Sequence, residues 1–145
     1  MSEIEDFLTA TEEQDIVAAI RKAEKNTSGE IRVHIEHSTK LDAFDRAKEV
    51  FHMLKMDNTK LQNGVLLYVA VTDRTFVIYG DEGINAVVPS NFWDTTRDTI
   101  TYHFRQGDFK QGLIEGILKA GQELQKHFPY QEGDTNELPD DISVG

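Results

Sequence analysis

The sequence contains no cysteine, which excludes disulfide bonds and thiolate chemistry from its fold and its function. Basic residues are also scarce, because 15 lysines and arginines stand against 26 aspartates and glutamates. The resulting net charge of −11 leaves no basic stripe for a nucleic-acid backbone, so we expect no nucleic-acid partner. A divalent cation or a protein partner of unknown identity is compatible with this charge.

Long hydrophobic runs are missing as well. No segment approaches the roughly 18 apolar residues of a transmembrane helix, and the acidic residues 1–6 do not resemble a signal peptide. We therefore expect a cytoplasmic protein without membrane insertion. A chain of 145 residues is long enough to bury a core as one domain. We assign this domain to residues 1–130 and expect a monomer, with an acidic and disordered tail over residues 131–145.

The most informative segment runs from Asn63 to Glu82. Its seven consecutive apolar residues, 65–71, predict a strand that is buried on both faces. The following residues 72–74 are too few to hold a helix, so the β-rich run over 75–79 is expected to return antiparallel as a hairpin. This segment therefore marks the centre of a sheet.

The flanking segments predict the rest of the fold. Apolar and polar residues alternate over 30–37, which predicts a half-exposed strand near a sheet edge, with His34 and Glu36 on the polar face. Helical periodicity predicts helices that begin near Thr11 and Thr39, and two more over 91–104 and 109–127. A strand, a helix and a strand of these lengths form a parallel crossover pair.

The predicted fold class is α/β. The expected architecture is a three-layer α/β/α sandwich, in which helices cover both faces of a small mixed sheet. The sheet would contain the parallel crossover pair and the antiparallel hairpin strand. The last predicted helix contains three glycines, which we expect to permit close approach of a neighbouring element: Gly112, Gly116 and Gly121.

Several segments together resemble the TPM domain family of thylakoid-lumen and bacterial proteins. The similarity spans residues 16–128 and is carried by Ser28-Gly29-Glu30-Ile31-Arg32-Val33, Asn63-Gly64-Val65-Leu66-Leu67, Val71-Thr72-Asp73-Arg74, Ile78-Tyr79-Gly80 and the run from Phe104 to Leu113. The resemblance implies an α/β/α sandwich, a divalent-cation site (calcium in some relatives) and acid-phosphatase-like activity in some relatives. The chain departs from the family pattern at residues 80–85 and in having Thr72-Asp73 in place of an acidic pair.

Two candidate sites follow from the predicted strand directions. Asp73 and Asp81 lie at opposite ends of the hairpin strand, so they cannot ligate one ion. Site one lies where the acidic loop meets the starts of the other strands, and its oxygen-rich side chains suit Ca²⁺ or Mg²⁺. Its candidate ligands are Asp81, Glu82, Glu30, Asn63 and Asp94.

Site two lies at the carboxyl ends of the parallel strands, where open α/β sheets often bind ligands. Asp73 is its candidate metal ligand. Ser38 and Thr39, placed at a predicted helix N-terminus, and Arg74 are its candidate ligand-binding residues. The structural alternative for Asp73 and Thr39 is turn and cap chemistry.

No motif predicts an organic cofactor, and the histidines are too scattered to share a metal; we expect them to be ordinary surface or half-buried side chains. Three hypotheses remain. The chain is a cytoplasmic divalent-cation-binding domain, a metal-dependent phosphatase-like hydrolase, or a non-enzymatic protein-interaction domain. We rank the cation-binding domain first and the phosphatase last, because the acidic residues of the family are present only in part.

Overall fold

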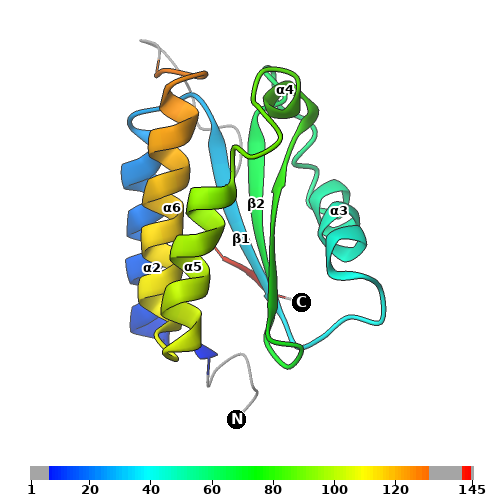
Figure 1. Ribbon diagram of the computed structural model, residues 1–145, viewed down its shortest axis with the longest axis vertical. Helices are drawn as coiled ribbons and strands as arrows, with labels where there is room; N and C mark the ends of the chain where they lie inside the picture. The colour runs from blue at the N-terminus through cyan, green and yellow to red at the C-terminus, as the bar shows by residue number, and fades with distance from the viewer. Residues whose placement is uncertain (1–6, 131–141, 145) are drawn as a thin grey trace.

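A four-stranded sheet separates two layers of helices in the computed structural model, which describes residues 7–130 and 142–144 (Figure 1). Helices α2, α5 and α6 cover one face of the sheet, and α3 covers the other (Figure 1). The predicted α/β/α sandwich is therefore confirmed. The elements are α2 (Ala10–Glu24), β1 (Glu30–Glu36), α3 (Ala43–Met53), β2 (Gly64–Ala70), β3 (Thr75–Gly80), α4 (Glu82–Asn85), α5 (Asp94–Arg105), α6 (Phe109–Gln125) and β4 (Ser143–Val144).

The sheet has the strand order β3-β2-β1-β4. Strand β2 is parallel to β1 and antiparallel to β3, as its sequence predicts. Every residue of β2 is buried, because its odd-numbered side chains pack under α2 and α6 while Leu66, Tyr68 and Ala70 pack under α3. The apolar run thus fixes the centre of the fold.

Strand β1 lies inside the sheet, and the prediction of a half-exposed strand near the edge was wrong. Strand β4 pairs with it in parallel at His34 and Ile35, and all its residues except Arg32 are buried. The polar face of β1 is covered by α3, whose Arg46 bonds to Glu36. At Ser143–Val144 the expected disordered tail is replaced by this edge strand, while residues 131–141 lie outside the described residues.

The helix boundaries differ from the sequence prediction at their starts. Thr9, not Thr11, caps α2, in a capping box with Glu12. Asp42, not Thr39, caps α3 by accepting a hydrogen bond from Phe44 N–H. The acidic loop contains the short helix α4, capped by Asp81, which periodicity could not reveal in four residues.

The glycines of α6 lie at helix contacts, as predicted. Gly121 faces Ala23 of α2, and a Cβ added there would lie 2.8 Å from the Ala23 Cβ. Helix α6 thus sits close to α2 on one side and α5 on the other (Figure 1). Among the described residues, no helix is long and apolar enough to cross a membrane.

Candidate functional site

Asp81 is the residue of site one that caps a helix. It follows β3, and its Oδ1 accepts a hydrogen bond of 2.7 Å from Glu82 N–H at the start of α4. The residue is only 7% exposed, and its Oδ2 is buried without a hydrogen-bond partner in the described part of the chain. Burial raises the pKa of Asp81, and the negative charges of Glu82 and Asp57 raise it further.

The other predicted residues of site one differ in burial and in the elements that hold them. Glu82 is exposed on the first turn of α4, while Glu30 and Asn63 are buried where β1 and β2 begin. Glu30 N–H donates to the Asn63 carbonyl at 3.3 Å. Asp94 is exposed on α5 and pairs with Arg97 at 3.1 Å. Across residues 7–130 and 142–144, no three His, Cys, Asp or Glu side chains are grouped to hold a metal ion.

The loop before β2 brings further oxygen atoms to this end of the sheet. A Cβ added to Gly83 would lie 2.2 Å from the Leu61 carbonyl oxygen and 2.5 Å from that of Gln62, so the loop packs directly against α4. In the same loop, the Thr59 hydroxyl is buried and makes no hydrogen bond to any described residue. Carbonyl and hydroxyl oxygens are ligand types that calcium accepts.

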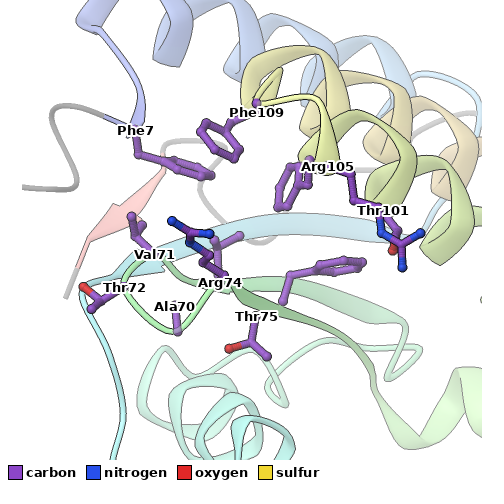
Figure 2. A pocket seen from close by; sticks show the side chains of 13 residues that line it. Phe7, Ala70, Val71, Thr72, Arg74, Thr75, Thr101, Arg105 and Phe109 are labelled. Atoms are coloured by element: carbon purple, nitrogen blue, oxygen red, sulfur yellow. The ribbon is translucent and has the colours of Figure 1, made fainter.

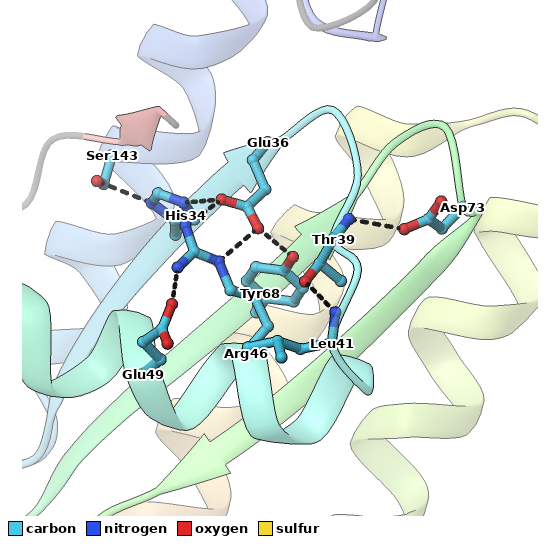
Figure 3. Close-up of polar contacts among 9 residues, drawn as sticks. All are labelled: His34, Glu36, Thr39, Leu41, Arg46, Glu49, Tyr68, Asp73 and Ser143. Atoms are coloured by element: carbon cyan, nitrogen blue, oxygen red, sulfur yellow. Dashed lines mark hydrogen bonds and ion pairs between the residues drawn. The ribbon is translucent and has the colours of Figure 1, made fainter.

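The structure brings two of the residues predicted for site two, Asp73 and Thr39, together. The Asp73 Oδ2 accepts a hydrogen bond of 3.0 Å from Thr39 N–H, and the Thr39 hydroxyl accepts one of 3.1 Å from Leu41 N–H (Figure 3). Helix α3 begins only at Ala43, so Thr39 belongs to the loop before it. The Thr39 amide already donates to Asp73 and is not free for an anion. Ser38 is exposed in the same loop. Asp73 and Thr39 therefore follow the structural alternative of turn chemistry.

Sequence reasoning missed a buried polar network between β1, β2 and α3 (Figure 3). Arg46 donates from Nε and Nη2 to the two carboxylate oxygens of Glu36, both at 2.9 Å. The Tyr68 hydroxyl donates to the same carboxylate, and His34 Nε2 lies 3.1 Å from Glu36 Oε1. A carboxylate only accepts, so Nε2 carries the proton of the neutral ring, and Nδ1 accepts from the Ser143 hydroxyl at 2.9 Å.

This network shifts the protonation of its members. Burial alone would raise the pKa of Glu36, but the hydrogen bonds from Arg46, Tyr68 and His34 outweigh it and hold the pKa at about 2. Burial lowers the pKa of His34 despite its hydrogen bond to Glu36, so the ring is neutral at pH 7. The pKa of Tyr68 is raised by burial and by the same carboxylate. The prediction that His34 is an ordinary surface or half-buried side chain was therefore wrong, since it is 1% exposed.

A cavity of about 1070 Å³ opens at the carboxyl ends of the parallel strands, between the sheet and the ends of α5 and α6 (Figure 2). Its walls include aromatic side chains from three parts of the chain, Phe7, Phe76 and Phe104 among them. Arg74 also lines it, although its neighbour Asp73 bonds to Thr39. The β2–β3 turn thus separates Arg74 from the other residues of predicted site two.

The comparisons with known proteins agree on one family and one fold. Residues 2–123 match the TPM domain family. The chain is 67% identical to the BA42 protein of the psychrophilic bacterium Bizionia argentinensis, whose NMR structure superposes with a TM-score of 0.94 and with 100% of both chains covered. No curated protein matches the chain.

Two more distant NMR structures share the fold alone. The N-terminal domain of a P. gingivalis protein is 23% identical with a TM-score of 0.69, and the match covers 84% of this chain and 79% of that domain. The N-terminal domain of a Corynebacterium glutamicum protein is 13% identical with a TM-score of 0.64, over 95% of this chain and 80% of that one.

Proposed function

The chain belongs to the TPM domain family, and from this premise we propose that it is a divalent-cation-binding domain that takes calcium at the Asp81 end of the sheet. One observation supports the proposal above the others. The Oδ2 of Asp81 is buried, and no described residue donates a hydrogen bond to it. A buried carboxylate without a partner is costly, and a bound cation would offset that cost.

The expected coordination is mixed. Asp81 and Glu82 supply carboxylates, and the loop of residues 57–63 supplies carbonyl oxygens that pack against α4. Because the described residues bring no third acidic or imidazole group together with these two, water completes the coordination. Few charged ligands mean weak binding, and we expect a dissociation constant on the order of 10⁻⁴ to 10⁻³ M.

A calcium titration followed by backbone amide shifts tests the site. We expect saturable shifts within residues 57–63 and 80–85 as calcium rises to about 10 mM. Asp81→Asn should abolish them, whereas Asp98→Asn, which removes the same charge from the exposed face of α5, should leave them unchanged. Shifts confined to other surfaces would refute this location. The same titration with magnesium shows which of the two ions binds more tightly.

The stability of Asp81→Asn gives a second, independent prediction. Asparagine keeps an oxygen that can cap α4 but removes a charge whose pKa is raised by burial, so without divalent ions the variant should unfold at the same temperature as the parent or a higher one. At about 100 times the dissociation constant, calcium should stabilise the parent by about 2.7 kcal/mol and the variant hardly at all. Thermal unfolding in a chelator and in calcium measures both effects. A variant that loses stability in the chelator would mean that the Asp81 charge is already compensated.

An aryl phosphate assay separates cation binding from hydrolysis. We expect no saturable turnover with calcium or magnesium in the parent protein. Metal-dependent turnover that is lost in Glu82→Ala or Asp73→Ala would instead support the phosphatase hypothesis that the family resemblance raised.

A further inference from the structure

We propose that the cavity beside Arg74 binds a small organic monocarboxylate with an aromatic or branched apolar body. The cavity lies at the opposite end of β3 from Asp81, so the proposal is independent of the cation site. Its volume of about 1070 Å³ is sufficient for a small organic molecule. Its position at the carboxyl ends of parallel strands is the usual ligand position in open α/β sheets.

The apolar part of the cavity is a continuous set of phenylalanine rings. Phe7 stacks on Phe109 with ring centroids 4.3 Å apart, and Phe104 makes edge contacts with Phe7, Phe109 and Phe76 at 5.4–5.9 Å. Three of the four rings, those of Phe76, Phe104 and Phe109, are only half-buried. Apolar surface left open at a cavity wall favours an apolar ligand that would complete its burial.

The charge at the cavity is opposite to that of the protein. Arg74 and Arg105 both line it, and neither guanidinium group has an ion pair or a hydrogen bond to a described residue. This is unusual in a chain of net charge −11, where Arg46 and Arg97 both pair with carboxylates. The two cationic side chains are therefore available to an anionic ligand.

Arg74 is the better placed of the two arginines. Its φ of 52° puts it in the left-handed region within the tight β2–β3 turn, so the direction of its side chain differs from that of Asp73. Figure 2 shows its side chain rising from the turn beside Val71, on the side of the cavity where Phe7 lies. Arg105 stands near Thr101 on the α5 side, so we expect it to contribute less to the same anion.

The ligand class follows from these walls. A guanidinium binds a carboxylate through two parallel hydrogen bonds. Next to phenylalanine rings, a singly charged group loses less hydration energy than a phosphate dianion would. The combination of one accessible guanidinium and an aromatic wall therefore favours an apolar monocarboxylate.

The test uses 3-phenylpropionate, with 3-phenylpropanol as its neutral control, in a chelator so that the cation site stays empty. We expect saturable amide and aromatic shifts in residues 69–76 and 101–109, and binding of the alcohol about tenfold weaker. Arg74→Gln should weaken the carboxylate about tenfold and leave the alcohol unchanged. Arg97→Gln, which removes an exposed arginine on α5, should change neither.

Three results would overturn the proposal. Equal affinity for the acid and the alcohol would remove the role of the arginine. Shifts away from the cavity would remove the site, and tighter binding of phenyl phosphate than of 3-phenylpropionate would reject the ligand class. Because Arg74 is exposed in a turn, the amide spectrum of its variant is expected to show an unchanged fold.

Discussion

Replacement of Glu36 by alanine is expected to lower the free energy of unfolding by about 4 kcal/mol, the largest loss that we predict for a single polar side chain in this protein. The carboxylate accepts hydrogen bonds from Arg46, Tyr68 and His34, and it is 4% exposed. Its removal takes the acceptor away from four donor groups on three side chains, and two of these side chains, Tyr68 and His34, are fully buried. Urea unfolding measures the loss, provided that the dependence of the unfolding free energy on urea concentration (the m-value) is the same in the variant and the parent.

Glu49 provides the matched control. It also accepts a hydrogen bond from Arg46, but its side chain is 54% exposed. We expect Glu49→Ala to cost less than about 1 kcal/mol, as is usual for exposed ion pairs. If the two alanine variants were equally stable, the buried network would contribute no more than a surface pair.

The same carboxyl predicts how stability depends on pH. The pKa of Glu36 is about 2 in the folded protein against 4.5 for a free side chain, so between these values the unfolded chain binds more protons. Its contribution of about 3 kcal/mol is complete above pH 4.5 and is lost as the pH falls toward 2. The lowered pKa of His34 acts in the same direction below pH 6.5. Glu36→Gln should therefore show a smaller loss of stability than the parent between pH 5 and pH 3.

The second large effect is expected at Gly83. An alanine there would place its Cβ 2.2 Å from the Leu61 carbonyl oxygen, and backbone cannot move aside as a flexible side chain does. We expect Gly83→Ala to cost about 3 kcal/mol, well above the gain of up to about 1 kcal/mol that alanine gives a helix. The loop over residues 57–63 should shift its amide signals even without calcium.

Gly80→Ala is the control for this substitution. A Cβ at Gly80 meets nothing closer than 3.5 Å, which is ordinary van der Waals contact with Trp93. We expect that variant to lie within about 1 kcal/mol of the parent protein. A Gly83→Ala protein as stable as Gly80→Ala would show that the loop packs loosely against α4.

The central part of the fold could be predicted because its signals are local. The apolar run of β2 and the short turn after it determine burial and antiparallel return within one segment. The position of β1 could not be predicted, because the polar residues His34 and Glu36 alternate as on an exposed face. Their burial depends on Arg46 and Tyr68, which come from α3 and β2.

The two candidate sites differed in what the sequence could indicate. The glycine and the acidic residues after β3 drew attention to Asp81 as a candidate metal ligand, and the structure shows that it also caps α4, a role with a local sequence signature. Asp73 and Arg74, which were predicted to share one site, make different contacts, since Asp73 bonds to Thr39 and Arg74 lines the cavity. Adjacent residues in a turn can point apart, and the left-handed backbone at Arg74 depends on the turn geometry rather than on the residue type.

The length of strand β3 also determines how strongly charges at the two ends of the molecule affect each other. Its six residues span about 20 Å at ~3.3 Å each, more than twice the Debye length of about 8 Å at physiological salt. Charge placed at the Asp81 end is therefore screened before it reaches Arg74. The free energies of binding at the two ends should add, so saturation with calcium should leave the dissociation constant of a carboxylate at Arg74 unchanged.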